Sequence, residues 1–412
     1  MSDNNGRSPE DDDAQKDPAE ELREALRNML HGGQGFDASK LAGVAGLPGD
    51  PALVQQLVAQ MQRALMQDGK GFSADTAAEH AKQIVSQGHR EVSDEEETRY
   101  EHTFRLAELW LAEATTIGEL VETPRTMTRR EWVGESAPTW ASLAEPVADS
   151  IADALMRALT EQLPDEMLGM VGQSNTMLRN IGGAMFSMQL GQVIGDLAKV
   201  VISGGDIGMP VLTRRRATLI PQNVDAFGEG LDIPASEVEL YLAVREVAHA
   251  RLFQHAKWLP LHLTSQVIEF AHGIQIDVRA IDDLASQIDP SSPEQIREAL
   301  SNGSFIPPRT PQQEAALARI ETMLALVEGW VDVVTQEAVE RLPKGEALGE
   351  MMRRRRASGG PAERAFSSLV GLELRPRRLR EASAMWRLVG EAHGVEERDK
   401  LWQHFDLSLI HI

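Results

Sequence analysis

The chain has 412 residues, of which 42% are hydrophobic and 25% charged, as in soluble globular proteins built from more than one helical layer or subdomain. Its formal net charge of -22 argues against general affinity for nucleic-acid phosphates or anionic membranes. The absence of cysteine excludes disulfides, thiolate nucleophiles and cysteine-bound metals, so any metal site must use His, Asp and Glu.

The composition changes along the chain. Residues 1–20 are acidic and have no apolar signal core, so we expect a disordered tail and a cytoplasmic protein. Residues 21–92 form a region punctuated by Gly and Pro, with short helices predicted at about 51–67 and 74–86. A helical domain is expected over residues 93–405, beginning at the helix-start pattern Ser93-Asp94-Glu95-Glu96. Residues 406–412 resemble a translated sequencing adapter, and His411 is given no role.

The fold class predicted for this chain is mainly α. Clean Val/Ile/Thr alternation is nearly absent, apart from short extended pieces near 209–212 and 218–221. Residues 167–201 are apolar but are interrupted by polar side chains well before the ~20 residues that a membrane span needs. Gly191 and Gly195 therefore predict close helix packing inside a soluble core. Arginine runs at 214–216, 353–356 and around 375–378 are interpreted as solvated faces or ion-pair partners.

A helix predicted from about Pro234 to Gln254 carries the string Arg245-Glu246-Val247-Ala248-His249. The string looks like the zinc-protease signature His-Glu-x-x-His with arginine in place of the first histidine. Helical spacing puts Arg245, Glu246 and His249 on one face. One interpretation makes Glu246 a catalytic base and His249 a zinc ligand. The other pairs Arg245 or a neighbouring group with Glu246 and leaves His249 hydrogen-bonded in the core.

A second helix is predicted from the capping box that Thr310 and Gln313 form. It places Glu321, Glu328 and Asp332 on one face, and Glu328 is expected to meet Glu246 and His249. The alternative partner for that carboxylate is an arginine. His255 lies on the opposite face of its helix from Glu246 and is a poor co-ligand.

Two further layouts use Glu269 and His272, which form a second Glu-x-x-His. Nineteen residues separate His249 from Glu269, the spacing of the third ligand in thermolysin-like zinc proteases. The paired motifs also suggest a di-iron carboxylate bundle. In that layout, however, the positions of Glu246 and Glu269 along the two helix axes would differ by roughly 6 Å. Further helices with matched glutamates are also missing.

The strings REVAHARLFQHAKWL at 245–259, LVEGWVDVV at 326–334, GGPAERAF at 359–366 and LVGLELRPRRLREA at 369–382 carry a family resemblance. Over about residues 95–405 the chain resembles the actinobacterial zincin-like metallopeptidases, which have a sister branch associated with deazaflavin-coenzyme biosynthesis. The resemblance implies a mostly helical zincin-like domain with Glu246 as general base and His249 and Glu328 as zinc ligands. The sequence departs from the pattern at Arg245 and at Trp330, which stands where the sister branch has histidine.

Two functions therefore remain open. The first is a zinc-dependent hydrolase acting on a peptide or protein substrate, with zinc held by His249, Glu328 and a further group such as Glu269 or His272. The second is a catalytically inactive helical binding or scaffold protein that has lost the metal. Neither involves nucleic acid or a membrane.

Overall fold

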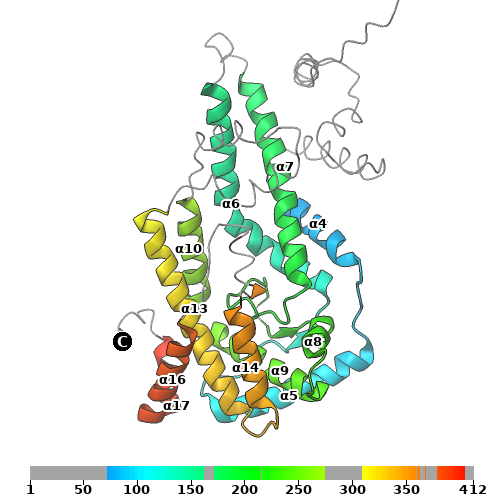
Figure 1. The fold of residues 1–412 in the computed structure, drawn as a ribbon, viewed down its shortest axis with the longest axis vertical. Helices are drawn as coiled ribbons and strands as arrows, with labels where there is room; N and C mark the ends of the chain where they lie inside the picture. Colours follow the sequence, from blue (N-terminus) through cyan, green and yellow to red (C-terminus); the bar gives the residue numbers. More distant parts are fainter. Residues whose placement is uncertain are drawn as a thin grey trace, which may run out of the picture. The chain divides into compact units, whose positions relative to one another are not determined.

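The computed structural model describes residues 72–161, 171–214, 216–273, 309–358, 360, 361, 367 and 378–403. Over these residues the chain is mainly α, as predicted (Figure 1). The only regular strands in the described part are two residues long each. The predicted tail at 1–20, the helix at 51–67 and the segment 406–412 with His411 lie outside the described residues.

Helix α4 (Ala74–Ser86) has the bounds that the sequence predicts, and it packs against α7 (Val171–Ala198) and α6 (Arg129–Glu161). A Cβ added at Gly191 would lie 2.6 Å from the backbone oxygen of Ala77, and one at Gly195 would lie 2.9 Å from Cβ of Ile84. The two glycines therefore permit the close helix packing that their spacing predicted. No helix in the described part of the chain has both the length and the apolar character to cross a bilayer.

Helix α9 (Ala235–His255) lies at the centre of the site and packs against α5 (Asp94–Ala114) and α13 (Pro311–Ala338). Every residue from Val238 to Phe253 except Ala250 is buried, which confirms a helix surrounded by other elements. Capping boxes at Ser93 and Thr310 start α5 and α13 as predicted. Helix α10 (Trp258–His272) follows α9 and packs against α13 and α6.

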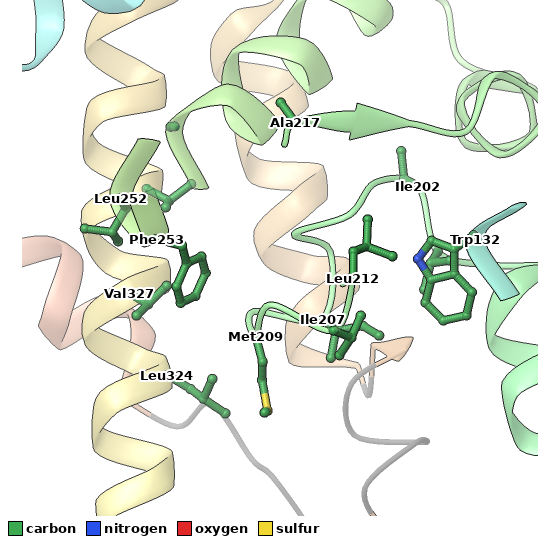
Figure 2. Close-up of a cluster of buried hydrophobic side chains, with 14 of the residues drawn as sticks. Trp132, Ile202, Ile207, Met209, Leu212, Ala217, Leu252, Phe253, Leu324 and Val327 are labelled. Carbon is green, nitrogen blue, oxygen red and sulfur yellow. The ribbon is translucent and has the colours of Figure 1, made fainter. Parts of the chain in front are cut away.

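The strands β1 (Arg125–Thr126) and β2 (Thr218–Leu219) pair in parallel. The extended piece predicted at 218–221 is thus confirmed for its first half, and α8 (Pro221–Gly228) begins where its second half was expected. The piece predicted at 209–212 is not a strand, because its backbone pairs with no neighbouring strand among the described residues. Its apolar side chains are nevertheless buried in the core. Met209 and Leu212 lie between α13 on one side and Trp132 on the other (Figure 2).

The C-terminal helices are attached by a buried ion pair. After α14 (Gly345–Ala357) and α16 (Leu379–His393), α17 (Val395–Lys400) and the short helix η2 (Leu401–Gln403) bring Arg398 and Asp399 into the core. Arg398 donates to Asp399 at 3.0 Å, to Glu337 at 2.9 Å and to the Ala114 carbonyl at 2.7 Å. Asp399 also accepts from Thr115 Oγ1 at 2.6 Å, so this pair joins α17 to α5 and α13.

Asp399→Ala is expected to lower the free energy of unfolding by about 3 kcal/mol or more, because it removes the buried carboxylate partner of the fully buried Arg398 guanidinium and leaves the partly exposed Glu337 as its remaining described counter-ion. Chemical denaturation measures the change. Glu397→Ala is the matched control, since this carboxylate is exposed on the same helix and its pair with Lys400 is worth at most about 1 kcal/mol. Equal costs for the two variants would contradict the role assigned to the buried pair.

Candidate functional site

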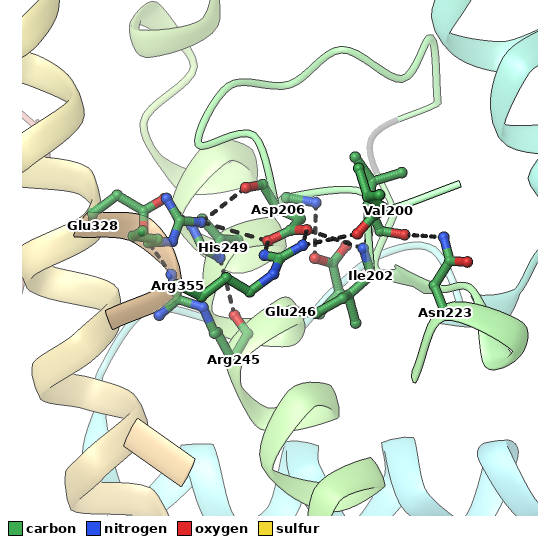
Figure 3. Close-up of polar contacts among 12 residues, drawn as sticks. Val200, Ile202, Asp206, Asn223, Arg245, Glu246, His249, Glu328 and Arg355 are labelled. Atoms are coloured by element: carbon green, nitrogen blue, oxygen red, sulfur yellow. Dashed lines mark hydrogen bonds and ion pairs between the residues drawn. The ribbon is translucent and has the colours of Figure 1, made fainter. Parts of the chain in front are cut away.

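The centre of the candidate site is the carboxylate of Glu328, on α13 and 3% exposed. His249 Nε2 donates to its Oε1 at 2.9 Å, and Arg356 Nη1 lies 2.8 Å from the same oxygen. Arg245 Nη2 donates to Oε2. Glu328 thus has both partners that the sequence offered as alternatives, a histidine and arginine, and it connects α9, α13 and α14 (Figure 3).

These neighbours control the protonation of Glu328. Burial alone would raise its pKa, but Arg356, His249 and Arg245 together hold the pKa far below its usual range. Burial lowers the pKa of His249 more than Glu328 raises it, so the imidazole is neutral at neutral pH. At Arg245 the order is reversed: burial opposes the charge, yet Glu328 raises the pKa of the guanidinium. The cluster therefore holds an ionised carboxylate between two guanidinium ions.

The arginine run on α14 supplies half of this cluster. Arg355 binds Asp206 at 2.7 and 2.9 Å and also donates to the Val200 carbonyl at 2.8 Å. Arg356 reaches Glu328 and the Asp206 carbonyl, while Arg354 is exposed and, among the described residues, pairs with Glu350 alone. The sequence left the run as a solvated face or as ion-pair partners, and it named no partner because Asp206 and Arg355 are 149 residues apart.

The carboxylate of Glu246 accepts hydrogen bonds from backbone amides and not from Arg245. The amide of Gly205 donates to its Oε2 at 2.8 Å, and the amide of Thr218 donates to its Oε1 at 3.0 Å. The Arg245–Glu246 pair considered from the sequence is therefore wrong, since Arg245 points to Glu328. Burial raises the pKa of Glu246 to about 7, although hydrogen bonds from Ser203, Thr218 and Gly205 act in the opposite direction.

The loop from Ser203 to Gly208 lies directly on the motif. A Cβ added at Gly205 would be 2.9 Å from both Glu246 Oε2 and His249 Cβ, and one at Gly208 would be 2.9 Å from Glu328 Oε1. Gly208 also has φ +80°, a backbone conformation that glycine adopts without a steric penalty. Glycine at these positions lets the loop approach the three side chains this closely, and the sequence analysis did not identify the loop although Gly204, Gly205 and Gly208 were visible.

A small cavity of about 30 Å³ adjoins Glu246 and His249, with room for roughly one water molecule. Gly204 and Gly205 line it on one side and Phe253 on another. Two side chains of the motif, Glu246 and His249, therefore border the same small cavity.

The other candidate ligands lie elsewhere. Glu269 and His272 are exposed on α10, where Glu269 pairs with Arg319 at 3.3 Å and His272 Nδ1 faces the Ile268 carbonyl at 2.9 Å. The structure does not bring them to Glu246, so neither the thermolysin-like nor the di-iron layout forms among the described residues. His255 ends α9 outside the cluster, as its helical position predicted.

Trp330 is turned away from the cluster. Two residues along a helix correspond to a rotation of about 200°, so position 330 lies on nearly the opposite face of α13 from Glu328. The indole N–H donates to Asp399 Oδ1 at 3.0 Å, and the ring packs against Trp402. A histidine at this position would face the C-terminal helices, so the departure at Trp330 matters less to the site than the one at Arg245.

The donor set does not fit a zinc ion. Protein zinc sites use three or four His, Cys, Asp or Glu ligands, and the described residues contain no converging group of three. His249 and Glu328 come together, but they bind each other, and Glu328 is already neutralised by Arg245 and Arg356. Arginine cannot lose its proton to become a ligand, and a fixed cation opposes the entry of a divalent one.

Comparisons with known proteins add the family. A family model described as zincin-like metallopeptidase matches residues 72–408. Among solved structures the chain is similar to a "putative hydrolase with a novel fold" from Chloroflexus aurantiacus, with 17% identity and a TM-score of 0.55. The similarity covers 81% of this chain and 92% of the other, and at this identity it shows the fold alone. A search of the curated proteins found no significant match.

Arg356→Ala is expected to destabilise the protein by about 3–5 kcal/mol, because it removes a buried partner of Glu328. Arg354→Ala, two residues away on the same helix, should cost less than about 1 kcal/mol because its side chain is 78% exposed. Urea denaturation of the two variants makes the comparison. Similar costs would show that the cluster does not hold α14 in place.

The raised pKa of Glu246 predicts a pH dependence of stability. The unfolded chain ionises this group near its ordinary pKa of 4.5, whereas the folded protein ionises it only near 7. Between these values the folded state binds more protons, so Glu246 makes stability fall as pH rises through this window and has no further effect above it. Wild type should lose up to about 3 kcal/mol relative to Glu246→Gln between pH 4.5 and pH 8.

Denaturation curves at several pH values test this expectation, with the exposed Glu95→Gln as control. If the free energy of unfolding changes with pH in the same way for wild type and Glu246→Gln, the backbone donors already keep Glu246 ionised in acid.

Proposed function

Since the chain belongs to the zincin-like metallopeptidase family, we propose that it is a metal-independent member of that family. In this proposal a buried ion-pair cluster stands where the family resemblance places zinc, and the helical domain works as a binding protein. We also propose that the protein is cytoplasmic and belongs to the actinobacterial branch, next to the deazaflavin-associated one. Its proposed partner is a peptide or a protein.

The proposal rests on one observation: the carboxylate of Glu328 is paired with Arg245 and Arg356 and hydrogen-bonded to His249. The carboxylate is buried and fully neutralised without a metal. Displacing the two guanidinium ions to make room for zinc would leave Arg245 buried without its carboxylate partner, which typically costs several kcal/mol, and would leave Arg356 with only its contacts to Asp206. The substitution at Arg245 therefore does more than remove a ligand, because it supplies a positive charge where the metal would supply one.

A second candidate is the zinc-dependent hydrolase, and one observation favours it. The pKa of about 7 at Glu246 suits a group that exchanges protons near neutral pH, and Glu246 and His249 share a cavity of water size. In that reading Glu246 is the general base, His249 and Glu328 are metal ligands, and the remaining ligand comes from a residue outside the cluster. The two candidates differ in metal content, which is directly measurable.

We expect protein expressed with added zinc and then dialysed to contain much less than one zinc per chain by elemental analysis. Arg245→His restores the second imidazole of the signature on the face of α9 that meets Glu328, so this variant should hold close to one zinc per chain. Arg245→Ala serves as control, because it removes the same charge without adding a ligand.

Stoichiometric zinc in the wild type, lost in His249→Ala and kept in His255→Ala, would overturn the metal-independent proposal and support the hydrolase. Failure of Arg245→His to bind zinc while remaining folded would show that Arg245 is not what excludes the metal.

A further inference from the structure

A surface cleft of about 620 Å³ lies between α8 and the first turns of α9, which pack against each other (Figure 1). Its apolar floor is formed by Val224 of α8, Val238 of α9 and Ile233 of the turn between them. Val224 and Val238 are buried and belong to the hydrophobic core. The volume is about twenty times that of the 30 Å³ cavity beside Glu246, and it lies in the range that holds a side chain or a small ligand.

The charges around this cleft leave an excess of one negative charge. The charged residues that line it are Arg90, Arg129, Asp225, Glu229 and Glu239. Counting their partners outside the cleft does not change the excess, because Arg90 also binds Glu96 and Glu239 also binds Arg99. Three guanidinium ions therefore face four carboxylates.

The negative charge is concentrated on the wall formed by residues 225–239. This segment has no lysine or arginine and carries five carboxylates, which belong to Asp225, Glu229, Asp232, Glu237 and Glu239. Glu229 is exposed and pairs with no cation among the described residues, while Asp225 shares Arg90 with Glu96. Arg129 comes from α6, and Asn223 Oδ1 and the Lys199 carbonyl accept from it at 2.7 and 3.3 Å. A cation in the cleft would therefore be attracted to the 225–239 wall and repelled by Arg129.

Glu239 is the buried carboxylate of this wall, and it has room for a further partner. It is 5% exposed, and its two oxygens lie 3.2 and 3.3 Å from the same donor, Nε of the exposed Arg99. Burial raises the pKa of Glu239 more than Arg99 lowers it. An ionised carboxylate can accept about four hydrogen bonds, so Glu239 can accept more of them from a cation that enters the cleft.

We propose that this cleft binds a lysine or arginine side chain of a peptide or protein partner. The cation pairs with Glu239 and is attracted further by Glu229. The methylene stem of the same side chain lies on the apolar floor of Val224, Ile233 and Val238. The single positive charge of such a side chain equals the excess negative charge of the cleft. The inference rests on the proposed function, because it names the chemical class of the partner that the binding protein takes.

Calorimetric titration of the full chain in a low-salt chelating buffer tests the proposal with acetyl-Ala-Arg-Ala-amide and with the same peptide carrying citrulline. Citrulline has the shape of arginine without its charge, so the arginine peptide should bind at least about tenfold more tightly. The corresponding lysine peptide should also bind more tightly than the citrulline peptide, and added salt should weaken the binding of both basic peptides. Methylguanidinium has the charge without the stem and should bind more weakly than the arginine peptide.

Glu239→Gln removes the buried charge of the cleft and should weaken binding of the arginine peptide at least about tenfold, while binding of the citrulline peptide stays unchanged. Glu229→Gln is the second variant, because its exposed side chain makes no ion pair among the described residues and its loss leaves the fold intact. It should weaken binding of the arginine peptide about three- to fivefold. Glu391→Gln, an exposed glutamate of α16, is the matched control and should bind as the wild type does. The melting temperature shows that each variant is folded, and Glu229→Gln decides if Glu239→Gln is not.

Equal affinities for the arginine and citrulline peptides, binding that Glu229→Gln and Glu239→Gln leave unchanged, or no saturable binding up to about ten millimolar peptide would each overturn the inference. These outcomes are separate from the zinc measurement. Metal-free protein that does not bind the basic peptides refutes the cleft alone, whereas zinc-loaded protein that binds them refutes the proposed function and leaves the cleft.

Discussion

The structure around the motif depends on one constraint, which is that the carboxylate of Glu328 is buried and ionised. A buried charge without partners would cost several kcal/mol, so three side chains from two other helices converge on it. Arg245 and His249 come from α9 and Arg356 from α14, which fixes the relative placement of three helices at one point. The cluster thereby joins three helices around one carboxylate whose charge is balanced by guanidinium groups.

The arginines of α14 also bind the loop from Ser203 to Gly208, through Asp206. Asp206 is 5% exposed, and Arg355 holds its pKa below the ordinary value although burial acts in the opposite direction. Its backbone carbonyl meets Arg356, and the neighbouring Gly205 amide meets Glu246. The loop, the motif helix and α14 therefore form one hydrogen-bonded unit, with glycine at the points of closest approach.

Trp330 illustrates how a departure from a family pattern can be misjudged. Its position beside Glu328 in the chain suggests a place in the same site, but a helix separates neighbours two residues apart onto opposite faces. Its indole N–H instead donates to Asp399. The buried pair of Asp399 with Arg398 attaches the C-terminal helices to α5 and α13. Of the two departures from the signature, Arg245 alone acts on the candidate site.

Local interactions are what the sequence by itself determined. The starts of α5 and α13 follow from Ser93 and Thr310, because a cap binds the backbone only three residues away. The face shared by Arg245, Glu246 and His249, and the close packing at Gly191 and Gly195, follow from helical spacing. The family resemblance also predicted that Glu328 meets His249. This contact spans 79 residues, and helical spacing cannot predict it.

Tertiary structure alone decided the rest. Arg356 and Asp206 enter the site from segments 150 residues apart. The parallel pairing of Arg125 with Thr218 joins segments distant in the chain, and only the second was expected to be extended. Whether Arg245 would meet Glu246 or Glu328 depended on which groups surround α9. Adjacent residues on a helix point in directions about 100° apart, and the loop amides had already satisfied Glu246. The sequence therefore located the motif, while long-range packing chose its partners.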